Sequence, residues 1–155
     1  MYEYRAHVNR VVDGDTVDVD IELGFGIVLT DERVRVMGID TPESRTSDKV
    51  EKIFGLAAKE RLKELLGKTT ILKTEINKDG EDMKGKFGRV LGDFLTDDGV
   101  RVTDILIEEG HAVKYHGQNK SDVEKAHLAN RNKLMHEGVV DPQVVQETEA
   151  KYGRR

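Results

Sequence analysis

The chain has 155 residues, of which 37% are hydrophobic, so it can form one compact domain with its own core. It contains no cysteine, which excludes disulfides, zinc–thiolate sites and a cysteine nucleophile, and any metal must be bound through oxygen or imidazole. The net charge of −5 is unusual for a protein that binds nucleic acid, but residues 13–22 carry five acids and no base, whereas residues 84–89 carry three bases and no acid. This separation of charge indicates a cation site beside a phosphate site.

The sequence shows neither the apolar segment of a secretory leader nor an apolar run long enough to cross a membrane. We therefore expect a soluble protein without a membrane partner, located in the cytoplasm or encoded by a phage and acting inside the cell. A secreted form whose leader has been removed is the alternative. We also expect a monomer.

The first third of the chain predicts an antiparallel meander. Valines at positions 8, 11 and 12 lead into the turn dipeptide Asp13-Gly14, and residues 16–23 then alternate between apolar and acidic, as in a half-buried strand. A Gly-Phe-Gly break precedes a further strand over residues 27–39. Because proline has no amide hydrogen, Pro42 should end the pairing, and residues 40–45 should form a loop.

The remaining chain predicts helices with two more strands. A helix should begin at Ser47 or Asp48 and end at Leu66, with Gly67 beyond it. The later elements expected are strands at 69–76 and 88–95, a polar loop at 77–87, a short helix at 104–109 ended by Gly110, and a third helix from the capping box Ser121-x-x-Glu124 to Gly138.

Strands first, with one helix inserted and two helices near the end, predict an α+β fold, a five-stranded OB-fold β-barrel with three α-helices. No repeat or linker divides the chain, so residues 1–138 should form a single domain. Residues 139–155 should form a loosely held C-terminal tail.

Two aspartates are candidates for holding a cation. Asp15 follows a glycine turn at the start of one strand, and Asp40 lies at the end of another, so neighbouring strands could bring them together. Two such charges need a cation between them. Calcium takes about six to eight oxygen ligands, and two aspartates with a loop carbonyl such as that of Thr41 leave positions for water and a substrate oxygen. Taken alone, Asp13-Gly14-Asp15 is more often an ordinary turn.

Glu43 follows Asp40 on a loop stiffened by Pro42, where it could accept a proton from water as a general base. The alternative is a loop carboxylate that pairs with Arg45. Arg35 and Arg89 could grip a phosphodiester, because a planar guanidinium stabilises the charge that develops as phosphorus becomes five-coordinate. Each arginine taken singly is more often part of a surface ion pair.

Other polar residues are interpreted as structural. Asp18, Asp20 and Glu22 alternate on the outer face of their strand, which predicts a solvated edge. His127 and His136 are separated by about 900° of helix, so they lie on opposite faces and cannot share a metal. His127 aligns with the buried stripe of its helix, which predicts a hydrogen-bonded core histidine.

Three blocks in order, Asp13-Gly-Asp-Thr16, Arg35-x4-Asp-Thr-Pro-Glu43 and Phe87-Gly-Arg89, resemble the signature of the staphylococcal nuclease family, also called thermonuclease or micrococcal nuclease. The resemblance extends from about residue 8 to residue 138. It implies an OB-fold enzyme that hydrolyses DNA, with RNA as an open alternative, depends on one calcium ion and leaves 3′-phosphate ends.

The resemblance also implies roles for single residues. Asp15 and Asp40 match the calcium-binding aspartates, and Thr41 matches the carbonyl ligand. Glu43 matches the proposed general base, while Arg35 and Arg89 match the phosphate-binding arginines, and the spacing selects Arg35 over Arg33. Lys86 is similar to a lysine near a terminal phosphate of the bound nucleotide, and Tyr115 to a tyrosine that stacks on the nucleotide.

The chain departs from the family pattern at two places. Gly85 precedes Lys86 where many members have aspartate, and the segment around Tyr115 has a single tyrosine, which would weaken base stacking. The alternative function is a non-catalytic OB-fold module that binds nucleic acid or protein. The intact set of five side chains, at positions 15, 35, 40, 43 and 89, favours the enzyme.

Overall fold

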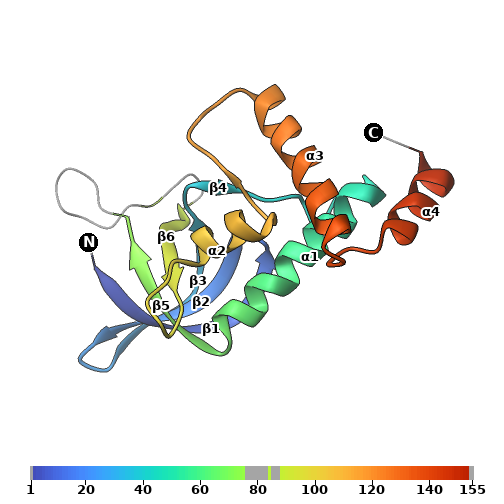
Figure 1. The fold of residues 1–155 in the computed structure, drawn as a ribbon. Coiled ribbons are helices and arrows are strands. Elements are labelled where there is room, and N and C mark those ends of the chain that lie inside the picture. Colours follow the sequence, from blue (N-terminus) through green and yellow to red (C-terminus); the bar gives the residue numbers. More distant parts are fainter. Residues whose placement is uncertain (1, 76–83, 85–87, 154–155) are drawn as a thin grey trace.

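The computed structural model of the protein describes residues 2–75, 84 and 88–153. Five strands form a closed barrel in the order β1-β2-β3-β6-β5 (Figure 1). These strands are β1 (Glu3–Asp13), β2 (Thr16–Gly24), β3 (Ile27–Val36), β5 (Thr69–Thr74) and β6 (Val90–Leu95). The predicted five-stranded OB-type barrel is thus confirmed. A separate pair, β4 (Ile39–Asp40) and β7 (Val113–Lys114), joins the end of the meander to the later half of the chain.

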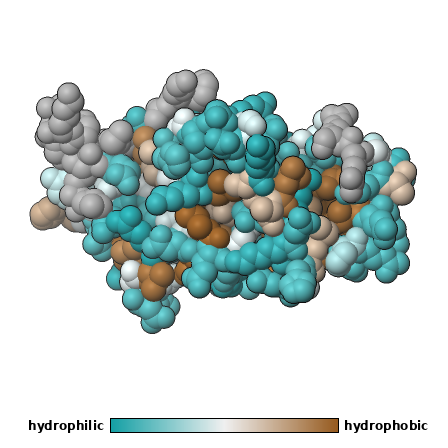
Figure 2. Space-filling model, turned by 45° about the horizontal axis from the view of Figure 1, so that its top comes forward, coloured by the Kyte–Doolittle hydropathy of each residue, from teal (hydrophilic) through white to brown (hydrophobic). Residues whose placement is uncertain are grey.

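The barrel interior follows from the apolar alternation of its strands. Val17 and Val19 of β2 are fully buried, as are Val34 and Val36 of β3 and Phe94 of β6. Side chains at alternate positions point to opposite faces of a strand, so these residues share the inner face. Hydrophilic residues cover most of the face shown in Figure 2, and hydrophobic residues gather near its centre.

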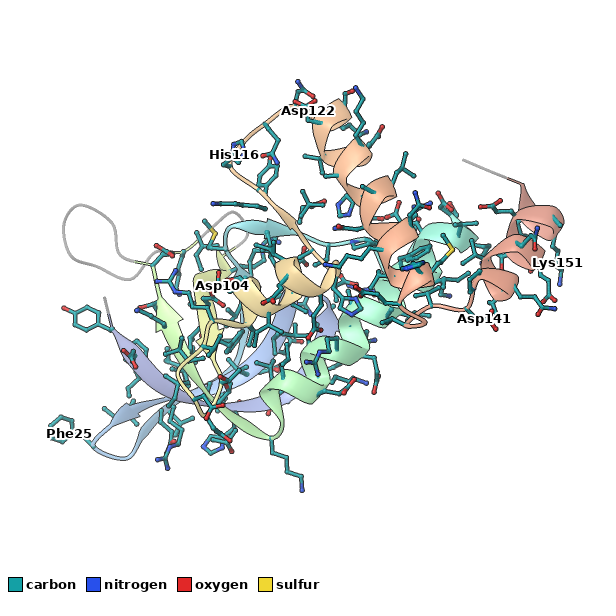
Figure 3. All side chains as sticks on the ribbon, viewed as in Figure 1. Phe25, Asp104, His116, Asp122, Asp141 and Lys151 are labelled. Atoms are coloured by element: carbon teal, nitrogen blue, oxygen red, sulfur yellow. The ribbon has the colours of Figure 1, made fainter. Side chains whose placement is uncertain are left out.

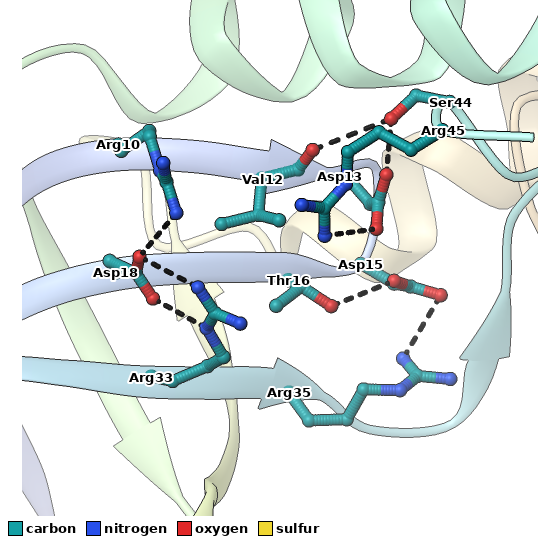
Figure 4. Close-up of polar contacts among 10 residues, drawn as sticks. All are labelled: Arg10, Val12, Asp13, Asp15, Thr16, Asp18, Arg33, Arg35, Ser44 and Arg45. Atoms are coloured by element: carbon teal, nitrogen blue, oxygen red, sulfur yellow. Dashed lines mark hydrogen bonds and ion pairs between the residues drawn. The ribbon is translucent and has the colours of Figure 1, made fainter.

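The prediction of a solvated edge is wrong for Asp18, which is 8% exposed. Its carboxylate accepts hydrogen bonds from Arg33 at 2.8 and 3.1 Å and from Arg10 at 3.3 Å (Figure 4). The hydrogen bond from Arg33 is the main reason that the pKa of Asp18 is lowered. Asp20 is also engaged, accepting hydrogen bonds from the side chain of Asn9 and the backbone of Asp31. The outer face of β2 therefore carries an ion-pair network.

Helix α1 (Lys49–Leu66) begins and ends as predicted. The side chain of Asp48 accepts hydrogen bonds from two backbone N–H groups of the first turn, and Gly67 follows the last turn with a φ of 62°. A positive φ of this kind favours glycine, which explains the sharp end. The helix packs against β1 on one side of the barrel.

Helices α2 (Val102–Glu109) and α3 (Lys120–His136) follow the barrel. Gly110 ends α2 in the left-handed conformation, as predicted. The capping-box prediction for α3 is wrong, because the N-cap is Asn119, whose side chain accepts a hydrogen bond from the N–H of Asp122. Helix α3 lies above α1 and beyond the end of the barrel where β4 is (Figure 1), and it contacts β7.

A fourth helix, α4 (Pro142–Tyr152), lies where a loosely held tail was predicted, so the described residues form four helices rather than three. Asp141 caps it and Pro142 occupies its first turn. Val145 is 5% exposed and packs in a cluster with Val50, Phe54 and Leu134. Figure 3 shows α4, between the labelled Asp141 and Lys151, at the end of the molecule beyond α1. Among the described residues, no helix combines the length and apolar character needed to span a membrane.

Candidate active site

A cavity of about 750 Å³ lies between the barrel end and helix α3. The barrel side supplies Arg35 of β3, Asp40 of β4 and the following loop with Thr41 and Glu43. The opposite side is formed by Tyr115, which follows β7, and by residues of α3, namely Lys120, Val123, Glu124, His127, Leu128 and Arg131. The cavity therefore gathers five of the eight residues that the sequence predicts for the site.

Asp15 lies beside this cavity, on the turn between β1 and β2. Its carboxylate oxygen Oδ2 is 3.3 Å from Nη1 of Arg35, and Oδ1 accepts a hydrogen bond of 3.0 Å from the hydroxyl of Thr16 (Figure 4). Arg35 also donates to the backbone carbonyls of Val36 at 2.6 Å and Ile39 at 3.1 Å. These bonds fix the guanidinium at the cavity wall, where the side chain is 22% exposed.

The turn before Asp15 depends on glycine because the neighbouring elements approach closely. A Cβ on Gly14 would lie 2.8 Å from Cβ of Ala58 in α1 and 3.1 Å from Cγ2 of Thr41. Thr41 itself is 6% exposed. The turn carrying Asp15, the loop after Asp40 and helix α1 are therefore packed into one unit.

The loop of Glu43 lies directly on helix α1. A Cβ on Gly55 would come within 2.2 Å of the carbonyl oxygen of Glu43, and the N–H of Glu43 donates to Oε2 of Glu51 at 2.9 Å. The hydroxyl of Ser44, which is 2% exposed, is hydrogen-bonded to the carboxylate of Asp13. With its backbone held in this way, Glu43 presents an exposed carboxylate at the cavity.

Arg45 forms an ion pair with Asp13, in which its Nη2 lies 4.0 Å from Oδ2 of the carboxylate. This argues against the alternative in which Glu43 serves only as the partner of Arg45. Ser44 and Arg45 instead connect the loop that follows Asp40 to Val12 and Asp13 at the end of β1 (Figure 4).

Asp40 has a partner that sequence reasoning missed. Its Oδ2 is 2.7 Å from Nε2 of His127, which is 16% exposed and lines the cavity. His127 is hydrogen-bonded, as predicted. The prediction that it lies in the core is wrong, because it lines the cavity and its partner is the candidate cation ligand Asp40. The helical period correctly places His127 on the inward face of α3. Only the tertiary structure shows what that face meets.

Arg89 does not line the cavity of Asp40. It lines a neighbouring cavity of about 380 Å³ together with Asp13, Thr16, Arg33 and Arg45. Tyr115 does line the cavity of Asp40 and is 46% exposed, and its backbone N–H donates to the carbonyl of Gly38 at 2.9 Å. Lys86 is outside the described residues.

The donor chemistry of the site fits a hard cation. Asp15 and Asp40 offer carboxylate oxygens, and Thr41 adds a backbone carbonyl, which are the ligand types that calcium prefers. The described part of the chain has no group of three or more histidine, aspartate or glutamate side chains that could hold a metal ion. Protein ligands would thus be few, and water and substrate would supply the others.

Comparison with known proteins finds a family match and several relatives of this chain. A model of the family described as staphylococcal nuclease homologue matches residues 33–137, a range that includes Arg35, Asp40, Glu43 and Arg89 but begins after Asp15. The chain is 30% identical over 118 residues to endonuclease YhcR of Bacillus subtilis (strain 168), which covers 73% of this chain and 9% of that protein. It is 34% identical over 128 residues to the SPbeta prophage-derived endonuclease YokF of the same organism. This match covers 77% of this chain and 40% of that protein.

A third relative, the thermonuclease of Staphylococcus intermedius, is 37% identical over 84 residues, which are 54% of this chain and 44% of that protein. The chain thus spans less than half the length of each of these three relatives. The family match covers most of the chain and the greater part of the cavity described above. The chain belongs to the staphylococcal nuclease homologue family.

Proposed function

We propose that this protein is a calcium-dependent endonuclease that hydrolyses phosphodiester bonds of DNA, with RNA as the second candidate substrate, and leaves 3′-phosphate ends. The observation that carries the proposal is the shared cavity of Arg35, Asp40, Thr41 and Glu43, with Asp15 held against Arg35 at 3.3 Å. The family membership and the endonuclease names of the relatives support the same chemistry.

In this reaction Glu43 accepts a proton from the attacking water, whose oxygen forms the new bond to phosphorus. The bond from phosphorus to the 5′ oxygen breaks, that oxygen takes up a proton from solvent water, and the phosphate stays on the 3′ oxygen; the proton held by Glu43 returns to solvent. Glu43 suits the role because it is exposed at the cavity while its backbone is anchored to α1. General-base catalysis of this kind contributes about 10² to 10⁴ in rate.

Arg35 stabilises the negative charge that grows on the equatorial phosphate oxygens. Its guanidinium is held by the carbonyls of Val36 and Ile39, so little reorganisation is needed when the substrate binds. Asp15, Asp40 and Thr41 would hold the calcium ion, which when bound supplies Lewis-acid stabilisation of the phosphate. Arg89, which lines the neighbouring cavity, would bind the substrate phosphate on a different side from Arg35.

A plasmid-cleavage assay tests the proposal against the alternative of a binding module. We expect nicking and then linearisation of the plasmid with calcium, and no cleavage with excess chelator. A labelled oligonucleotide product should resist polymerase extension until a phosphatase removes its 3′-phosphate. If DNA binds but stays intact with calcium, magnesium and manganese at neutral and mildly alkaline pH, the protein is a binding module.

A further inference from the structure

The contact between Asp40 and His127 joins two elements that are 87 residues apart in the chain. Asp40 ends β4 at the cavity, and His127 projects from the middle of α3 on the opposite wall. The distance of 2.7 Å between Oδ2 and Nε2 is that of a charge-assisted hydrogen bond. An ionised carboxylate has only acceptor atoms, so the imidazole N–H donates.

His127 belongs to a row of side chains that fixes α3 to the rest of the molecule. Asn130 donates to the carbonyl of Ala112 at 3.2 Å, Lys133 is hydrogen-bonded to the carbonyl of Glu108, and Leu134 is 2% exposed. Positions three and four residues apart share one face of a helix. With the helix anchored at these points, the imidazole has a fixed position relative to β4.

Building on the proposed nuclease function, we propose that His127 is a positioning residue for the calcium ligand Asp40. The hydrogen bond occupies one acceptor site of Oδ2 and fixes the plane of the carboxylate, so that its remaining lone pairs face the cation site. The hydroxyl of Thr16 makes the corresponding bond to Oδ1 of Asp15, at 3.0 Å. Each predicted aspartate ligand thus has one hydrogen bond that orients it.

The surroundings of His127 favour this role over that of a cation ligand or of a core histidine. A calcium ion prefers oxygen to imidazole, and Nε2 is already directed at Asp40, so His127 is not the cation ligand. His127 is not a core histidine, because its side chain is 16% exposed and lines the cavity beside Asp40. Hydrogen-bond partners of metal ligands typically account for about 10-fold to 100-fold in metal affinity or activity.

Two substitutions that differ by one methylene test the role. His127→Gln keeps an amide N–H at the reach of Nε2, whereas the shorter side chain in His127→Asn does not reach it. His136→Asn is the matched control, because His136 is an exposed histidine on the same helix. Calcium affinity is measured by titration calorimetry with calcium chloride, and kcat is measured separately at saturating calcium, with thermal melting to verify folding.

We expect His127→Asn to bind calcium about 10-fold more weakly. His127→Gln should recover most of that loss, His136→Asn should match the wild type, and kcat at saturating calcium should stay within about threefold for all three variants. If His127→Asn bound calcium as tightly as the wild type, the positioning role would be overturned while the proposed nuclease function would stand. Loss of kcat at unchanged calcium affinity would also overturn it, since His127 would then act on the substrate. A wild-type protein that neither binds calcium nor cleaves DNA would overturn both proposals.

Discussion

Arg33 and Arg35 lie two residues apart on β3 but have different surroundings. Arg33 is engaged by Asp18 through two hydrogen bonds, whereas Arg35 reaches the cavity and is held by two backbone carbonyls and by Asp15. That the two arginines also differ in role, with Arg35 as the phosphate-binding one, stays a prediction from the motif spacing. The ammonium group of lysine cannot replace a planar guanidinium that is fixed in this way, because it lacks the paired N–H donors that bind two phosphate oxygens together.

Arg35→Lys should therefore lower kcat/KM for DNA cleavage by about 10²-fold, because transition-state contacts are lost. Arg33→Lys is the matched control: it weakens the pair with Asp18 and should leave kcat/KM within about threefold. Steady-state cleavage of a defined oligonucleotide measures both. Equal losses in the two variants would mean that spacing does not distinguish the arginines.

A local sequence pattern was enough to predict residues that lie together in one cavity, whereas contacts with distant partners could not be predicted. Arg35, Asp40, Thr41 and Glu43 are close in sequence, and the strand and loop that carry them bring them to one cavity. No local pattern connects Asp40 with His127, because the contact exists only after α3 packs over the barrel. Asp18 was misjudged for the same reason, since two arginines on neighbouring strands bury it.

At the scale of elements, the strands and the first helix were predictable because each has a local signal. Apolar alternation marked β2, and Asp48 and Gly67 marked the ends of α1. Residues 139–155 were expected to form a loose tail, although Asp141 and Pro142 mark the start of α4, since proline is favoured in the first turn of a helix. Its apolar contacts come from α1 and α3, which the local sequence does not reveal.

Adjacent valines of α4 test whether this helix is docked. Val145 is 5% exposed, whereas Val144 is 45% exposed. We expect Val145→Ala to lower the free energy of unfolding by about 1 to 3 kcal/mol through lost burial and an unfilled cavity. Val144→Ala should change it by no more than about 0.5 kcal/mol. Urea denaturation compares them, and equal small effects would support a loosely held tail.

At the scale of the whole molecule, the buried His111 links stability to pH. It is 4% exposed, and its Nδ1 has no hydrogen-bond partner within the described ranges. Burial is the main cause that lowers the pKa of His111, opposed by Glu109 and Glu64 and reinforced by Arg61. Since the unfolded chain then binds the proton more readily, stability is unaffected above the ordinary histidine pKa of about 6.5 and falls as pH drops below it.

At pH values below about 6.5, we expect His111 to lower the free energy of unfolding of the wild type by at most about 1.4 kcal/mol for each pH unit. His111→Leu should remove this component of the pH dependence, because leucine does not titrate. Urea denaturation of both proteins between neutral and mildly acidic pH gives the difference. If the free energy of unfolding changed with pH in the same way in both proteins, His111 would be protonated equally in the folded and unfolded states.

In the molecule as a whole, the barrel end and α3 form one cavity, and α1 anchors the loop that carries Glu43, the proposed general base, at its wall. The most direct measurement compares kcat and DNA affinity for wild type and Glu43→Gln with calcium, using Glu60→Gln on the exposed face of α1 as control. Loss of the base should lower kcat by about 10² to 10⁴ while the Kd for DNA stays within about threefold. An unchanged kcat, or an equal loss of kcat and DNA affinity, would contradict the role of Glu43 as the general base.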